Sequence, residues 1–114
     1  MPVQHWSEKI WVVTVTEDLE FSEEIECLQI ELASMMDMPN VVVDLSGMRS
    51  INSSNLSLLL KLRKQLIEGE RKLRIVSPPD SIWVVFLSTA LDKVFSFKET
   101  IATALAELQM LENK

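Results

Sequence analysis

The feature that most constrains the fold is the short apolar run VVVDL at residues 41–45. Pro39 and Asn40 stand before it and a polar stretch from Ser46 to Asn55 follows it, so the run has the length of a strand rather than a helix. Its valines follow one another without polar residues between them. Such a strand is buried on both faces, which is typical of a parallel sheet covered by helices.

Helix patterns lie on both sides of this strand. Ser22 is expected to cap a helix with Glu23 and Glu24 in its first turn, where the helix dipole favours acidic side chains. A second helix is expected over about residues 53–68, ended by Gly69.

Further strands are expected at residues 10–16, 72–76 and 93–97, with residues 3–6 pairing with the first of them across a turn. A short apolar helix is expected after Pro78 and Pro79, and Ser96 with Glu99 suggests a capping box before a last helix. Strands that alternate with helices predict an α/β fold. We expect one domain over residues 1–114, with a mixed, mostly parallel sheet of four to five strands and about four helices.

Composition excludes several classes of function. The 114 residues carry a formal net charge of −6, which argues against nucleic acid as the main ligand because phosphate binding relies on cationic surfaces. A single cysteine, Cys27, excludes a disulfide framework and a cysteine-rich metal site, and it is expected to be a packing residue. No segment has the length of a membrane span or the pattern of a secretory signal. We therefore expect a cytoplasmic protein without cofactors and without direct membrane insertion.

Catalysis is not expected. A serine nucleophile needs an adjacent base, and the only histidine, His5, lies near the N-terminus, far in the sequence from Ser53 and Ser54. The two glycines, Gly47 and Gly69, do not form a phosphate-binding loop.

The polar cluster between the central strand and its helix has two interpretations. Asn52, Ser53 and Ser54 are all good helix-capping residues, and a helix has to begin there. The cluster also follows the carboxyl end of a predicted parallel strand, where ligands and partners meet α/β folds.

Trp83 is similarly open to two interpretations. On a helix, Ile82 and Phe86 fall on one apolar face, while Trp83 and Leu87 fall on another. The second face is either covered by neighbouring elements or forms a partner surface.

The segment VVVDLSGMRSINSSNLSLLLKL resembles the central signature of the STAS domain, the anti-sigma factor antagonist family, in which a strand is followed by DLS and then by DSSGL at the start of a helix. VVFLSTALDKVFSF is similar to a late stretch of that family, and TEDLE at residues 16–20 is similar to its early acidic turn. Asn52 stands where the family usually has aspartate, and Asn55 stands where it usually has glycine.

The resemblance implies a partner-switching protein. It would bind an anti-sigma factor that is also a serine kinase and would be switched off by phosphorylation at Ser53, with Ser54 as the second candidate. A serine phosphatase would reverse the modification, and a homodimer is possible. The residues expected to meet the partner are Asp18, Glu20, Asn52, Ser54, Asn55, Ser57 and Trp83. The alternative is a STAS scaffold that docks on the ATPase of an ABC transporter without being phosphorylated.

Overall fold

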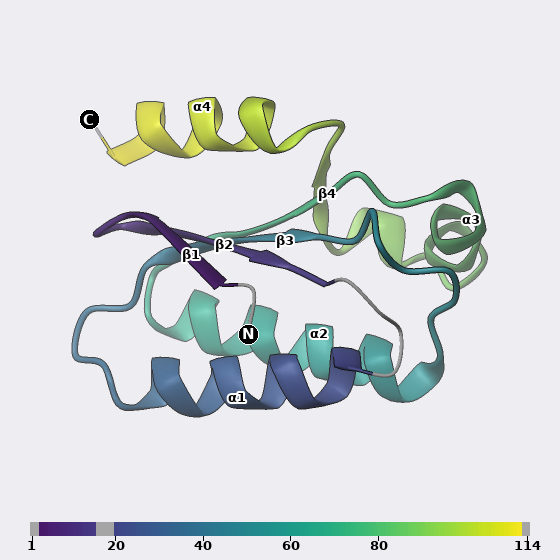
Figure 1. Cartoon of the computed structure of the whole chain (residues 1–114), viewed down its shortest axis with the longest axis horizontal. Helices are drawn as coiled ribbons and strands as arrows, with labels where there is room; N and C mark the ends of the chain where they lie inside the picture. Colours follow the sequence, from purple (N-terminus) through teal and green to yellow (C-terminus); the bar gives the residue numbers. More distant parts are fainter. Residues whose placement is uncertain (1–2, 16–19, 113–114) are drawn as a thin grey trace.

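The computed structural model describes residues 3–15 and 20–112, arranged around a five-stranded sheet (Figure 1). The strands are β1 (Val3–Ser7), β2 (Ile10–Thr14), β3 (Asn40–Asp44), β4 (Leu73–Val76) and β5 (Ser96–Lys98). The helices are α1 (Phe21–Ala33), α2 (Ser53–Glu68), α3 (Asp80–Ser88) and α4 (Ile101–Glu112), with a 3₁₀ turn, η2 (Leu91–Lys93), before β5.

The order of strands in the sheet is the order in the chain, β1-β2-β3-β4-β5. Only β1 runs antiparallel to its neighbour, whereas β2, β3, β4 and β5 are parallel. Parallel neighbours need crossover connections, and the helices supply them. The mostly parallel mixed sheet and the four helices confirm the predicted α/β architecture.

β3 is buried on both faces, as its sequence predicts. Val41 and Val43 belong to the larger apolar core, which α1 and α2 cover from below in Figure 1. Val42 faces the other way and packs with Ala104 and Leu108 of α4 in a smaller core. Every residue of β3 is buried.

The predicted start of α1 is wrong by two positions. Ser22 does not cap the helix, because α1 begins at Phe21 and Glu20 occupies the cap without a side-chain hydrogen bond. Phe21 is fully buried, so packing of this first residue takes precedence over the local capping preference of Ser22.

The predicted capping box before α4 is also wrong. Ser96 is the first residue of β5 and pairs with Arg74 of β4, so it lies outside the helix. The hydroxyl oxygen of Thr100 instead accepts a hydrogen bond from the Thr103 amide at 3.1 Å. Tertiary strand pairing therefore moves the helix start past the serine.

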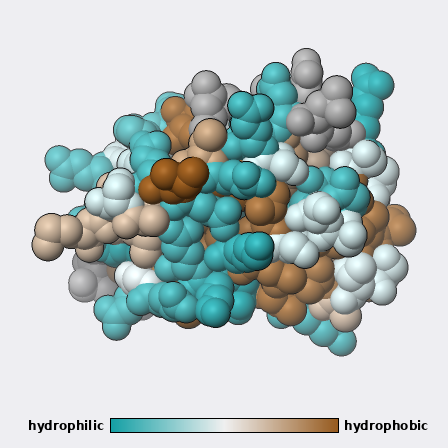
Figure 2. All heavy atoms as spheres, turned by 90° about the horizontal axis from the view of Figure 1, so that it is seen from below, coloured by the Kyte–Doolittle hydropathy of each residue, from teal (hydrophilic) through white to brown (hydrophobic). Residues whose placement is uncertain are grey.

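The outer surface of the α1 and α2 layer is divided along its length. Seen from below, it is mostly hydrophilic, and hydrophobic side chains gather on the right, the side on which α3 lies (Figure 2). Val84 and Leu87 of α3 are 58% and 49% exposed. On this face, the hydrophobic side chains therefore gather on the side of α3.

Candidate functional site

The loop that leads from β3 to α2 is held at several points. Asp44, the last residue of β3, accepts a hydrogen bond from the Ser46 amide on its Oδ1 atom at 2.9 Å. Met48 and Ile51 are buried and belong to the larger core. These contacts fix the position of the polar residues that follow β3, at the edge of the sheet where this strand ends.

The first turn of α2 is closed by a reciprocal pair of asparagines. Asn52 is the cap, and its Oδ1 accepts from the Asn55 amide at 2.9 Å. The Asn55 Oδ1 in turn accepts from the Asn52 amide at 3.1 Å. This is a capping box in which asparagine takes the position usually held by glutamate or glutamine.

Asn55 also joins the starts of two helices. Its Nδ2 donates to the Oγ of Ser22 in α1 at 3.3 Å, and its side chain is buried, with 5% exposed. Asn55 lies inside α2, and no residue of its turn has a positive φ. The backbone here therefore does not require glycine, and the Asn55 side chain is hydrogen-bonded within the protein.

Three exposed hydroxyl groups lie on the first two turns of α2. Ser53 is the first residue of α2, and Ser53, Ser54 and Ser57 are all exposed. Asn52 supplies the cap, so the hydroxyl of Ser53 is not needed to hold the turn. A helix N-terminus has free backbone amides and a favourable dipole, so an anion on Ser53 would be stabilised there.

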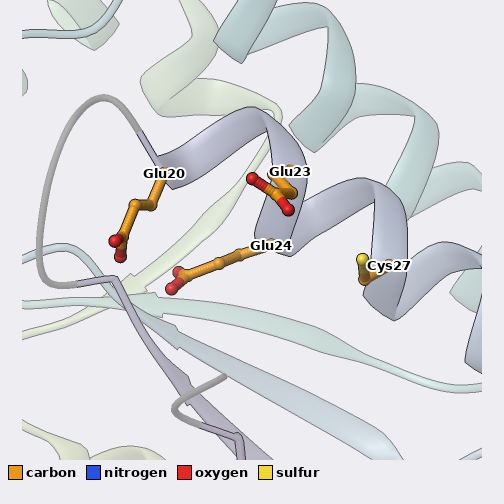
Figure 3. A pocket seen from close by; sticks show the side chains of 4 residues that line it. All are labelled: Glu20, Glu23, Glu24 and Cys27. Carbon is orange, nitrogen blue, oxygen red and sulfur yellow. The ribbon is translucent and has the colours of Figure 1, made fainter.

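The start of α1 carries a small acidic hollow. Among the described residues it is lined by Glu20, Glu23, Glu24 and Cys27, and its volume is about 240 Å³ (Figure 3). Cys27 is exposed, so the prediction that it is a packing residue is wrong. Asp18, the other acidic residue expected to meet a partner, lies outside the described residues.

Glu24 was expected only as an acidic residue of the first helical turn and not as a site residue. It is buried, with 7% exposed, and its Oε2 has no hydrogen-bond partner in the part of the chain that the structure describes. Burial raises the pKa of Glu24, and the negative charge of Glu20 raises it further. Helical spacing could have revealed this residue, because Glu24 neighbours the buried Phe21 and Ile25 on the inward side of α1.

Trp83 has a mainly structural environment. It is half-buried, packs against the larger core and meets Phe97 edge to face at a centroid distance of 4.9 Å. The exposed apolar side chains of α3 are instead Val84 and Leu87. The start of α3 is tied to the loop before α2, because the Ser81 hydroxyl donates to the Arg49 carbonyl at 3.0 Å.

The structure therefore brings together the starts of α1 and α2, which carry Glu20, Ser22, Asn52, Ser53 and Asn55. Within residues 3–15 and 20–112, histidine, cysteine and acidic side chains do not gather in threes as a metal site would need. In the same ranges no helix has both the length and the apolar character to cross a bilayer.

Comparisons with known proteins agree with this architecture. An anti-sigma-factor antagonist (STAS) domain protein from Planctomyces limnophilus is 19% identical, with a TM-score of 0.79 over 94% of this chain and 96% of that one. A serine-to-glutamate variant of RsbS from Moorella thermoacetica is 15% identical, with a TM-score of 0.82 over 99% of this chain and 97% of that one. A chain from a structure of the stressosome, described as a signal integration and transduction hub, is 14% identical, with a TM-score of 0.76 over 99% of this chain and 100% of that one.

At these identities the likeness is one of fold. A comparison with curated protein sequences finds no significant match. The family model of the STAS domain matches residues 3–104, which is most of the chain. The protein therefore belongs to the STAS domain family.

Proposed function

We propose that this protein is an anti-sigma factor antagonist that binds a protein partner at the starts of α1 and α2 and is released from it by phosphorylation of Ser53. The observation that carries the proposal is the exposed Ser53 hydroxyl at the first position of a helix whose cap is already supplied by Asn52. A kinase can modify this hydroxyl without removing the group that holds the turn. The partner we propose is an anti-sigma factor with serine kinase activity, and a serine phosphatase would reset the switch.

The expected effect of the phosphate falls on the interface rather than on the fold. A phosphoryl group adds nearly two negative charges and considerable bulk at the N-terminus of α2, where the helix tolerates an anion. Glu20 lies in the neighbouring turn, since Ser22 and Asn55 are hydrogen-bonded to each other. Like charges and the loss of hydration at a contact surface can cost several kcal/mol, which is enough to release a partner.

The test is to incubate the protein with ATP and the serine kinase encoded beside its gene, and then to locate the phosphate by mass spectrometry. We expect a single modification at Ser53. In a binding assay with the same kinase, Ser53→Asp should lose the partner, whereas Ser53→Ala should bind whether or not ATP is present.

Ser54→Ala is the matched control, because Ser54 is exposed in the same turn. This variant should still be labelled and should still switch. An active kinase that leaves Ser53 unlabelled, or that labels Ser54 instead, would contradict the assignment of the acceptor.

A second candidate function is supported by the apolar surface of α3, where Val84 and Leu87 are exposed. A STAS scaffold that docks on an ABC transporter ATPase would use such a surface and would need no phosphorylation. Leu87→Ser would then abolish binding of the ATPase encoded in the same operon, while Ser53→Asp would leave that binding unchanged. Leu87 suits this test better than Trp83, which also packs on Phe97.

A further inference from the structure

The acidic hollow at the start of α1 contains a carboxylate oxygen, Oε2 of Glu24, that no described residue satisfies. Glu24 is 7% exposed, and among residues 3–15 and 20–112 nothing forms a hydrogen bond with its Oε2. The other described residues around the hollow are Glu20, Glu23 and Cys27, so no basic side chain among them balances the acidic groups. A buried acceptor of this kind is unfavourable until a donor reaches it.

The arrangement of the carboxylates indicates which donor would fit. Figure 3 shows the side chains of Glu20 and Glu24 extending toward the same space. A metal ion is a poor candidate, because no three ligating side chains converge in the part of the chain that the structure describes. A guanidinium group carries five N–H donors in a planar fork and can bridge two carboxylates, and its positive charge offsets theirs.

We propose that an arginine side chain of the protein partner enters this hollow and is held between Glu20 and Glu24. The inference rests on the proposed function, because it assigns a specific contact to the partner that docks at this end of the molecule. Ser22, between these two glutamates in the sequence, is bonded to Asn55 in the first turn of α2. The hollow is therefore adjacent to the Ser53 surface, which is the exposed start of α2 with Ser53, Ser54 and Ser57. One partner can cover both.

The first test needs no knowledge of the partner. The probe is Nα-acetyl-L-arginine N-methylamide, added to ¹⁵N-labelled protein at pH 7 while amide chemical shifts are recorded. We expect saturable shifts at residues 20–27. The corresponding citrulline derivative has a similar shape without the charge and should cause no saturable shift.

Two glutamine variants make the test specific. Glu24→Gln should lower the affinity for the arginine probe at least tenfold, because it removes the buried negative charge that holds the guanidinium. Glutamine has the shape of a protonated glutamate, so the fold should persist, which the remaining amide resonances will show. Glu31→Gln alters an exposed carboxylate on the same helix and should leave the affinity unchanged.

Several outcomes would overturn the inference. These are equal shifts with the citrulline derivative, unchanged affinity in Glu24→Gln, or saturation of the same amides by Ca²⁺ or Zn²⁺ at lower concentrations than the arginine probe. The titration uses neither the kinase nor ATP, so it can fail while Ser53 is still phosphorylated. Conversely, an unlabelled Ser53 would leave a positive titration standing.

Discussion

Asn55 shows how one side chain can connect local and tertiary structure. Its side-chain oxygen accepts a hydrogen bond from the Asn52 amide, and its own backbone amide donates one to the Asn52 side chain. Its side-chain nitrogen donates a third hydrogen bond to Ser22 in α1. A glycine at this position, as in the related motif, could make only the backbone part of these contacts. We infer that Asn55 fixes the first turns of α1 and α2 relative to each other, and that it supports the Ser53 surface from inside.

Replacing Asn55 with the glycine of the related motif should therefore destabilise this protein. Asn55→Gly removes two side-chain hydrogen bonds and places glycine inside a helix, so we expect a loss of about 2 kcal/mol in the free energy of unfolding. Urea denaturation followed by circular dichroism will measure it. Asn52→Gly is the matched control, because glycine at a helix cap should cost only a few tenths of a kcal/mol. Equal losses in the two variants would contradict the linking role of Asn55.

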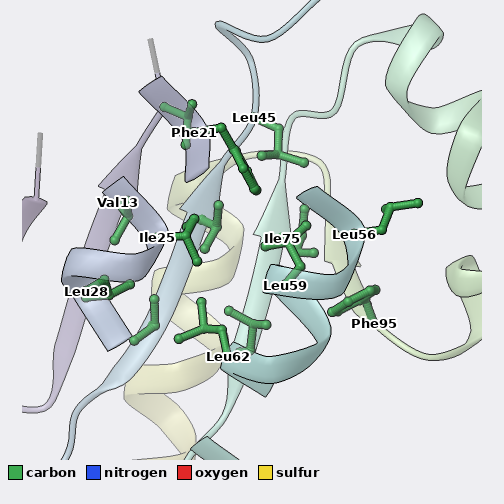
Figure 4. Packing of buried hydrophobic residues seen from close by; sticks show 14 of the residues in the cluster. Val13, Phe21, Ile25, Leu28, Leu45, Leu56, Leu59, Leu62, Ile75 and Phe95 are labelled. Carbon is green, nitrogen blue, oxygen red and sulfur yellow. The ribbon is translucent and has the colours of Figure 1, made fainter. Parts of the chain in front are cut away.

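At the scale of elements, α2 is held by one apolar face against the sheet. Leu59, Leu62 and Leu66 are fully buried, and Leu59 and Leu62 reach toward Ile75 of the sheet in Figure 4. Leu60, one residue after Leu59, is 37% exposed. Hydrophobic burial on this face orients the helix, and its N-terminus with the serines is carried to the edge of the sheet as a result.

Replacing neighbouring leucines of α2 with alanine should change the free energy of unfolding by very different amounts. Leu59→Ala should reduce the free energy of unfolding by about 2 to 5 kcal/mol, because it opens a cavity in the larger core. Leu60→Ala should reduce it by less than about 1 kcal/mol. Thermal and urea unfolding of the two variants will test this, and similar losses would mean that the orientation of α2 described here is wrong.

At the scale of the whole molecule, the two faces of the sheet are held differently. The face covered by α1 and α2 has the larger apolar core, whereas α4 packs on a smaller cluster. Glu107 of α4 pairs with Arg74 of β4, and its Oε2 lies 2.9 Å from Lys98 Nζ of β5. This carboxylate joins α4 to two parallel strands and supplements the smaller core.

The contribution of Glu107 should depend on pH. Burial raises the pKa of Glu107, but the hydrogen bonds and charges of Arg74 and Lys98 outweigh burial and lower it overall. Its stabilisation should thus be complete above the ordinary glutamate pKa of about 4.3 and be lost as the pH falls through the lower folded-state value.

The measurement is urea unfolding of Glu107→Gln between acidic and neutral pH. At neutral pH we expect a loss of about 1 to 2 kcal/mol, since the carboxylate accepts two charge-assisted hydrogen bonds but is partly exposed. The difference from the natural protein should shrink as the pH falls. Glu68→Gln, which breaks an exposed pair with Lys64 at 3.9 Å, should change stability by less than about 0.5 kcal/mol. A loss in Glu107→Gln that does not depend on pH would contradict the assignment.

The parts of the fold that follow from local pattern were predictable. The valine run at β3 and the helix from Ser53 are correct because apolar spacing and capping chemistry act over a few residues. The predicted starts of α1 and α4 were wrong because contacts with distant parts of the chain decide them: Phe21 is buried in the core, and Ser96 pairs with β4. Cys27 was expected to pack but is exposed, whereas Glu24 is buried, since a small rotation about the helix axis decides which side chains face the interior.

The sequence by itself determined the class of fold, the family motif and the position of Ser53 at the start of a helix, because these depend on short-range periodicity and residue chemistry. Only the tertiary structure decided that Asn55 is hydrogen-bonded to Ser22, that Glu24 is buried beside Glu20, and that Trp83 packs edge to face against Phe97. These contacts join segments or faces whose relation is set by how the helices pack on the sheet. That packing depends on the shapes of many buried side chains together, and no single stretch of sequence records it.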